Sequence, residues 1–269
     1  MTDKKASNIK LIAVDMDGTL VNDRKEMPKD FIPWIKAHKD KKIVIASGRA
    51  YYTNVALFGD AAKDMIFLSD NGGVIYENGS FLYQKGLETE EVIKCIRLFE
   101  GNPLTEVILC AADQSYLHDP AGDEDYQWQV DTYYINHTYT EDLEQAAKDH
   151  KIIKVSVYIR EKKAQEVFDS LPELGGELKA SVGGPEWIDI GNKTVDKGAG
   201  LKILEEIKGV SREETMAFGD YMNDYTMLQE AGESYAMENA IPEIKKIAKY
   251  QAPSNNDEGV MKVLKKVFD

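Results

Sequence analysis

The feature that most constrains the fold is an apolar run near the start of the chain, at residues 9–14. The run shows almost no alternation between apolar and polar positions, and Asp15 and Asp17 follow it. A strand of this composition is buried on both faces, which is typical of a parallel sheet covered by helices on each side. We therefore expect the two acids at a strand end, where α/β proteins bind ligands.

Short apolar runs with polar ends recur in the first and last parts of the chain. The runs that predict further strands are residues 42–46, 65–68, 215–218 and 234–237. Helices are expected to open near Pro28 and at Lys197, with two more at residues 242–249 and 259–267. Strands that alternate with helices in this way indicate a parallel sheet with crossover helices.

The middle of the chain has a different pattern, from about Tyr83 to Gly191. It combines helix-like and strand-like stretches with a polar, aromatic segment at residues 113–139. We predict a Rossmann-like, doubly wound parallel α/β core from residues 1–82 and 191–269, with an inserted α+β cap at 83–190. The two ends of the chain should then build one sheet.

Composition restricts the partners. The net charge of −14 argues against a nucleic-acid or anionic membrane surface, because both require a basic patch. It is compatible with a small phosphorylated molecule, since a few cations and one metal ion can invert the field inside a pocket. No apolar run reaches the roughly 18 residues of a membrane helix, and residues 1–8 lack the apolar core of a signal peptide. A cytoplasmic protein is therefore expected.

Chemically versatile side chains fall at the ends of predicted strands or at a helix start: Asp15 and Asp17, Ser47, Lys197, and Asp220 with Asn223 and Asp224. Acids from two strands, a hydroxyl and an ammonium group can hold a phosphoryl group beside a magnesium ion, which prefers oxygen ligands. An ionised Asp15 could attack phosphorus, and Asp17 could then protonate the leaving oxygen and later deprotonate a water.

Each of these residues also has a simpler explanation. Asp17 and Gly18 alone would predict a turn, Ser47 could cap a helix, and Lys197 could be a solvated surface lysine. The cysteines Cys95 and Cys110 have no partner at ligand spacing and are expected to be packing residues. The presence of Asp220 after a second apolar strand favours the catalytic interpretation of the acids.

Four ordered motifs resemble those of haloacid dehalogenase (HAD) superfamily phosphatases, and in particular the Cof-type hydrolases with a large α/β cap. They are residues 15–20 (DMDGTL), 45–49 (IASGR), 197–198 (KG) and 219–224 (GDYMND). The resemblance extends through residues 236–240 and 257–260, and it covers both core segments. It implies a magnesium-dependent phosphatase that acts on a small phosphorylated metabolite, such as a sugar phosphate, through an aspartyl-phosphate at Asp15.

The resemblance also implies roles for single residues. Asp15 would be the nucleophile, Asp17 the acid/base that also binds the metal through its backbone carbonyl, and Asp220 a side-chain metal ligand. Ser47, Gly48 and Lys197 would bind phosphate, while Asn223 and Asp224 would orient the metal shell and Lys197. Residues 187–196 lack the proline that many relatives carry before the lysine, which leaves the shape of that segment open.

Several alternatives stay open at this point. A phosphotransferase or mutase could use the same aspartate, and a non-catalytic ligand-binding protein could keep the fold. The aromatic residues of segment 126–139 could form a substrate lid or simply pack a small domain. Asn71, after another predicted strand, could contact substrate or serve a tight turn.

Overall fold

The computed structural model describes residues 8–269 of the chain. The expectation about a signal peptide rests on the first residues and lies outside the described part. The chain divides into two compact units. The first comprises residues up to Gly48, Asn54–Tyr83 and Asp196–Asp269, and the second comprises Arg49–Thr53 and Gln84–Val195.

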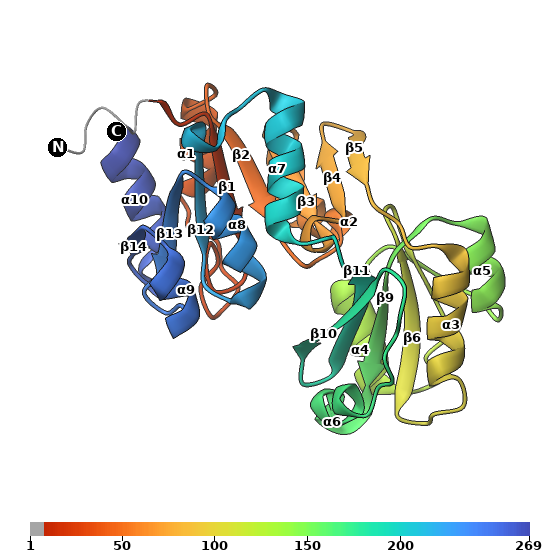
Figure 1. Cartoon of the computed structure of the whole chain (residues 1–269). Coiled ribbons are helices and arrows are strands. Elements are labelled where there is room, and N and C mark those ends of the chain that lie inside the picture. The colour runs from red at the N-terminus through yellow and green to blue at the C-terminus, as the bar shows by residue number, and fades with distance from the viewer. Residues whose placement is uncertain (1–7) are drawn as a thin grey trace. The chain divides into compact units, whose positions relative to one another are not determined.

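The first unit is built on an eight-stranded sheet in the order β14-β13-β12-β1-β2-β3-β4-β5 (Figure 1). The strands are β1 (Leu11–Asp15), β2 (Lys42–Ala46), β3 (Met65–Ser69), β4 (Val74–Glu77), β5 (Ser80–Gln84), β12 (Thr215–Gly219), β13 (Glu233–Met237) and β14 (Tyr250–Ala252). Neighbours from β14 to β3 pair in parallel, whereas β3 and β4 pair antiparallel. The predicted α/β fold class is confirmed, and both ends of the chain contribute to this one sheet.

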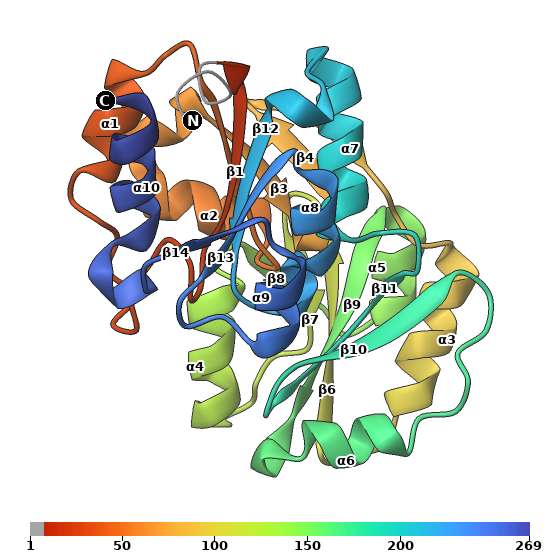
Figure 2. The ribbon, with the colours of Figure 1, turned by 60° about the vertical axis from the view of Figure 1, so that its left-hand side comes forward.

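Helices cover the two faces of this sheet. They are α1 (Phe31–Ala37), α2 (Tyr51–Phe58), α7 (Lys197–Lys208), α8 (Tyr225–Glu230), α9 (Pro242–Ile247) and α10 (Gly259–Phe268). Figure 2 shows α1 and α10 on one face and α7 and α8 on the other. Every residue of β1 is buried, as a central strand requires when both of its faces are covered.

The second unit contains a six-stranded sheet in the order β10-β11-β9-β6-β7-β8. Its strands are β6 (Thr105–Ala111), β7 (Ser115–Leu117), β8 (His137–Tyr139), β9 (Ile152–Ile159), β10 (Leu178–Gly184) and β11 (Trp187–Asn192). Its helices are α3 (Thr89–Phe99), α4 (Glu124–Tyr133), α5 (Leu143–Asp149) and α6 (Ala164–Asp169). Helices α3, α5 and α6 share one apolar cluster with the sheet, and α4 belongs to another cluster.

The aromatic segment divides by burial. Tyr126 and Tyr134 are buried, and Tyr134 packs at 5.6 Å between ring centroids from Trp187 of β11. Trp128 is 60% exposed, so it takes no part in that packing. The buried cysteines Cys95 and Cys110 carry free thiols within this unit.

Several elements were not predicted from the sequence. Strands β4, β5 and β14 extend the core sheet, while β7, α4 and β8 lie inside the segment taken only as polar and aromatic. The division expected at residue 191 differs from the observed one, because β11 continues to Asn192 and the second unit ends at Val195. Among residues 8–269, no helix is long and apolar enough to cross a membrane.

Candidate active site

The register of three parallel strands places the candidate residues at one edge of the core sheet. Asp15 of β1 pairs with Ala46 of β2, so Ser47 leaves its strand beside Asp15. On the other side Val14 pairs with Phe218 of β12, the strand that leads to Asp220. Because parallel strands end at the same edge, the sheet brings these side chains together at its carboxyl side.

Lys197 lies at the centre of the site and is completely buried. Its ammonium nitrogen donates to Oδ1 of Asp15 at 2.5 Å and to Oδ1 of Asp224 at 2.6 Å. These contacts join residues that are 182 and 27 positions apart in the chain. A buried ammonium requires such partners, because an unpaired charge in the interior is costly.

The charges of this cluster shift its proton affinities. Burial raises the pKa of Asp15 well above its usual range, and the charge of Asp224 adds to the increase while Lys197 opposes it. For Lys197, burial favours the neutral form, but the carboxylates of Asp15 and Asp224 outweigh it and raise the pKa. The lysine therefore stays charged at neutral pH.

Asp220 lies beside this pair at the end of β12. Burial and then the charge of Asp224 raise its pKa to about 6, although a hydrogen bond from the Thr19 hydroxyl at 3.0 Å opposes the increase. Gly18, at a φ of +81°, passes directly over Asp220, and a Cβ atom there would lie 2.4 Å from Oδ2. Only glycine fits this close approach, because an L side chain rarely adopts such a φ.

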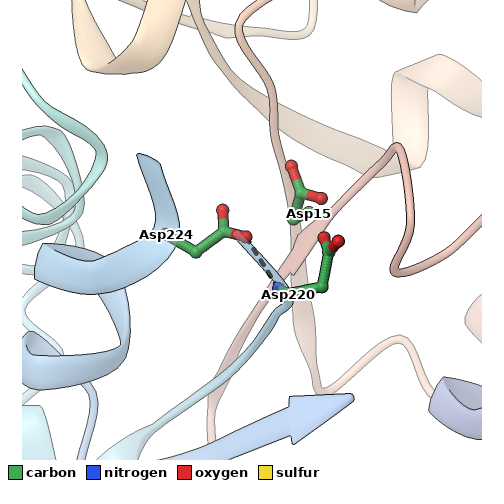
Figure 3. A group of neighbouring side chains, drawn as sticks. All are labelled: Asp15, Asp220 and Asp224. Atoms are coloured by element: carbon green, nitrogen blue, oxygen red, sulfur yellow. Dashed lines mark hydrogen bonds between the residues drawn. The ribbon is translucent and has the colours of Figure 1, made fainter. Parts of the chain in front are cut away.

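Asp224 is held by hydrogen bonds on both carboxylate oxygens. Oδ1 accepts from Lys197, and Oδ2 accepts from the backbone N–H groups of Asp220 at 2.8 Å and Tyr221 at 3.1 Å. Figure 3 shows the bond to Asp220 and the three carboxylates of Asp15, Asp220 and Asp224 facing one another. With both oxygens occupied, Asp224 is suited to fixing Lys197 and the turn after β12.

The three carboxylates fit a hard divalent cation. One oxygen from each of Asp15, Asp220 and Asp224 lies within 4.8 Å of the others, and Asp224, whose two oxygens already accept hydrogen bonds, would support such an ion indirectly. The single ammonium of Lys197 leaves the group with net negative charge, which agrees with the raised pKa values of Asp15 and Asp220. Oxygen donors in such an arrangement suit magnesium, and an ion bound there would relieve the repulsion.

The start of α7 is shaped to deliver Lys197. The carboxylate of Asp196 accepts a hydrogen bond from the backbone of Ala199 at 2.8 Å, which caps the helix. Gly198 packs so tightly on α8 that a Cβ atom would lie 2.6 Å from the backbone of Thr226. The Lys-Gly pair therefore combines a charged side chain with a close helix contact.

Asp17 lies apart from the three grouped carboxylates. Strand β1 ends at Asp15 and Met16 lies in a turn, so the alternation of side chains along a strand does not determine the direction of Asp17. Its Oδ1 atom instead accepts a hydrogen bond from Lys25 at 2.7 Å. Its predicted role as acid/base and metal ligand stays a prediction.

The loop after β2 and the turn after β3 meet beside the carboxylates. Ser47 is buried, and its carbonyl accepts a hydrogen bond from the backbone N–H of Asn71 at 3.0 Å. The side-chain amide of Asn71 packs closely on Gly48, since a Cβ atom on that glycine would lie 3.2 Å from Nδ2. Asn223 donates to Oδ1 of Asn71 at 3.2 Å. Asn71 therefore connects the candidate phosphate loop to the turn that carries Asn223.

Sequence reasoning missed two residues of this neighbourhood, Thr19 and Lys25. Thr19 was inside a quoted motif, and its position after Gly18 was the available signal. Lys25 offered no signal, because a lysine in a polar turn is ordinarily a surface residue.

The chain is similar to known proteins over nearly its whole length. A family model described as haloacid dehalogenase-like hydrolase matches residues 12–264. A 5-amino-6-(5-phospho-D-ribitylamino)uracil phosphatase of Escherichia coli (strain K12) is 32% identical over 265 residues, which cover 97% of each chain. A Bacillus subtilis (strain 168) phosphatase of the same description is 27% identical over 267 residues, 96% of each chain.

Solved structures agree with these matches. A haloacid dehalogenase-like hydrolase from Bacteroides thetaiotaomicron superposes with a TM-score of 0.85 at 26% identity. The alignment covers 97% of this chain and 100% of the other.

Proposed function

We propose, from the premise that this chain belongs to the haloacid dehalogenase-like hydrolases and is a phosphatase, that it hydrolyses a small phosphate monoester with Mg²⁺ through an aspartyl-phosphate at Asp15. The observation that carries this proposal is the buried Asp15 carboxylate, bonded to Lys197 and grouped with Asp220 and Asp224. A carboxylate beside a fixed cation and further acids has the surroundings of a nucleophile that must approach an anionic substrate.

In the first step, a carboxylate oxygen of Asp15 forms a bond to phosphorus as the bond from phosphorus to the leaving oxygen breaks. Asp17 gives its proton to that leaving oxygen, so the alcohol departs neutral. In the second step, a water attacks the aspartyl-phosphate and Asp17 takes up the water's proton. Inorganic phosphate leaves, and both acids return to their initial states.

Lys197 has two tasks in this scheme. It compensates the charge of Asp15 and Asp224, with which it is buried, and it would attract the phosphoryl oxygens of the substrate. We assign Ser47 and Gly48 to the same oxygens, because both lie where β2 ends beside Asp15.

Magnesium would be held by the side chains of Asp15 and Asp220 and by the backbone carbonyl of Asp17. Asn223 and Asp224 would support these ligands from the turn after β12. When bound, the ion supplies positive charge that offsets the repulsion between the nucleophile and the phosphate.

The substrate is proposed to be a small phosphorylated metabolite, and the relatives suggest one candidate. Both relatives described above are named as phosphatases of 5-amino-6-(5-phospho-D-ribitylamino)uracil, a phosphorylated sugar-alcohol chain on a pyrimidine. This compound and simple sugar phosphates are the first to test. The negative net charge also supports a substrate other than nucleic acid, and we place the enzyme in the cytoplasm.

The test measures phosphate released from a panel of phosphorylated metabolites and 4-nitrophenyl phosphate, with Mg²⁺ or with EDTA. We expect turnover that needs Mg²⁺ and falls by at least about 1,000-fold in Asp15→Asn, since removing a nucleophile costs factors of this size. Asp30→Asn, an exposed acid paired with Lys265, is the matched control and should keep full activity.

Acid quenching with a labelled substrate should trap phosphate on the wild-type chain and none on Asp15→Asn. Full activity of Asp15→Asn would overturn the mechanism. Transfer to a second sugar hydroxyl instead of water, dependent on a bisphosphate activator, would identify the alternative mutase. Absence of turnover across the panel would favour a ligand-binding protein that keeps the fold.

A further inference from the structure

Lys25 is held beside Asp17 by an unusual backbone conformation. Its ammonium nitrogen lies 2.7 Å from Oδ1 of Asp17, and its φ of +62° is in the left-handed region. The left-handed conformation is energetically unfavourable for lysine, so neighbouring contacts must stabilise it.

A tight turn enforces the conformation of Lys25. The side-chain oxygen of Asn22 accepts hydrogen bonds from the backbone of Arg24 and of Glu26, both at 2.9 Å. The carbonyl of Asn22 accepts a third from the backbone of Lys25 at 2.8 Å. The turn therefore fixes the direction in which the Lys25 side chain leaves the backbone.

Amide side chains from the end of the core sheet fix the loop that carries this turn. Asn239 donates to the carbonyl of Gly18 at 2.7 Å, and its side-chain oxygen accepts from the backbone of Asn255 at 3.1 Å. Asn255 is buried, and its side chain donates to the carbonyl of Val21 at 3.1 Å. These contacts span 221 and 234 positions of sequence.

A second pair extends this brace to the loop tip. Asn256 donates to the Asp23 carboxylate at 3.0 Å and accepts from the Asp23 backbone at 3.1 Å. Hydrogen bonds from Asn256 and Asn255 lower the pKa of Asp23, so its carboxylate stays charged and bonded. Asparagines 239, 255 and 256 together form what we call the amide brace.

We infer that Lys25 is a positioning residue for Asp17, and that the amide brace sets its place. The inference rests on the proposed function, because it assigns a task to the acid/base of that reaction. The ammonium group of Lys25 donates to Oδ1 of Asp17 at 2.7 Å and so fixes the direction in which the Asp17 carboxyl group points. Lys25 thereby holds the Asp17 carboxyl group in one orientation for proton exchange with the leaving group.

The experiment uses the leaving group as the readout. An alkyl phosphate needs a proton on its leaving oxygen, whereas 4-nitrophenol leaves as a stable anion. Values of kcat/KM report the steps up to departure of the leaving group, so we compare Lys25→Met with wild type on both substrates. Lys265→Met is the matched control, because Lys265 forms a similarly exposed ion pair with Asp30. The side chains of Lys265 and Asp30 are 45% and 59% exposed, and those of Lys25 and Asp17 are 63% and 40% exposed.

For Lys25→Met, we expect kcat/KM for the alkyl phosphate to fall by about tenfold, a part of the 10²–10⁴ that general acid catalysis supplies. The value for 4-nitrophenyl phosphate should fall less than about twofold. Asn256→Ala loosens the exposed part of the amide brace. It should also lower the ratio of kcat/KM for the alkyl phosphate to kcat/KM for 4-nitrophenyl phosphate. Lys265→Met should change neither value.

Equal losses on both substrates, or no loss on either, would overturn the role of Lys25. An unchanged ratio in Asn256→Ala would overturn the role of the brace. Asp17→Asn on the same two substrates separates this inference from the function on which it rests. If the wild type turns over neither substrate, or if Asp17→Asn loses both equally, the proposed function or its acid fails instead.

Discussion

The ammonium group of Lys197 lies 2.5 Å from a carboxylate oxygen of Asp15, and both side chains are shielded from solvent. The pair is asymmetric, because Lys197 also binds Asp224 at 2.6 Å. One cation therefore compensates two buried carboxylates, and the charge that is left over is what a metal ion would meet.

Replacing Lys197 by Met should destabilise the fold as well as abolish turnover. The substitution leaves Asp15 and Asp224 buried without their cation, and breaking a buried ion pair costs about 3 to 5 kcal/mol. Urea unfolding in EDTA measures the loss. Lys202→Met, on the exposed side of the same helix, should leave the unfolding midpoint unchanged, and an equal loss in both variants would contradict the central role of Lys197.

Gly18→Ala should damage the metal site more than it damages the fold. The new Cβ atom would lie 2.4 Å from Oδ2 of Asp220, so the carboxylate must move. Gly209 is the matched control, since it has a φ of +62° and no atom within 4 Å of a Cβ. Both variants should lose about 1 kcal/mol of stability from the left-handed backbone, but only Gly18→Ala should weaken Mg²⁺ binding in calorimetric titrations. Equal Mg²⁺ affinities would show that Asp220 adapts.

Binding of Mg²⁺ should weaken as the pH falls through about 6. The pKa of Asp220 is raised to about 6, and below that value a proton competes with the ion for the carboxylate. Each further pH unit should lower the affinity about tenfold, which is measurable as a smaller Mg²⁺-induced rise in Tm at pH 5 than at pH 7.5. Asp220→Asn should give a weaker response, and the pH dependence that remains should come from Asp15, whose pKa is also raised. A response that is the same at both pH values would contradict the assignment of Asp220.

Glu205→Gln should stabilise the protein at alkaline pH. Glu205 on α7 is buried, and burial raises its pKa to about 7, with Glu230 adding to the increase and Thr215 opposing it. Between pH 4.5 and 7 the folded state keeps a proton that the unfolded state releases, so stability declines as the pH rises through this window.

The neutral amide of Glu205→Gln avoids that loss. We expect it to gain about 1 to 3 kcal/mol over wild type at pH 8 and nothing at pH 4.5. Thermal unfolding at the two pH values provides the measurement. A gain that is independent of pH would mean that packing, not charge, is responsible.

The fold class followed from the sequence because its signals were local. The apolar run before Asp15 has the composition of a central strand, and its neighbours β2 and β12 show the same pattern. Strands β4 and β5 were not predicted because they are less buried and lie at the sheet edge, where β4 pairs antiparallel with β3. Their residues lack the continuous apolar run that marks a strand covered on both faces.

The residues of the candidate site could be predicted from the sequence only where they belong to a recognisable motif. Asp15, Lys197, Asp220 and Asp224 were selected as residues, and the structure brings them together. Their roles stay predictions until they are measured. The contact of Lys25 with Asp17 was out of reach, because it depends on a turn geometry and on asparagines more than 200 positions away.

The pairing of β1 with β12 has a consequence for synthesis on the ribosome. Thr19 and its partner Asp220 are 201 positions apart, so translation at 5–20 residues per second separates them by about 10 to 40 seconds. Throughout that interval β1 can pair with β2, but its other edge stays open to wrong partners. The nascent chain thus carries Asp15, the proposed nucleophile, long before Asp220, the proposed metal ligand, is made, and a chaperone that covers this edge would act on the incomplete sheet.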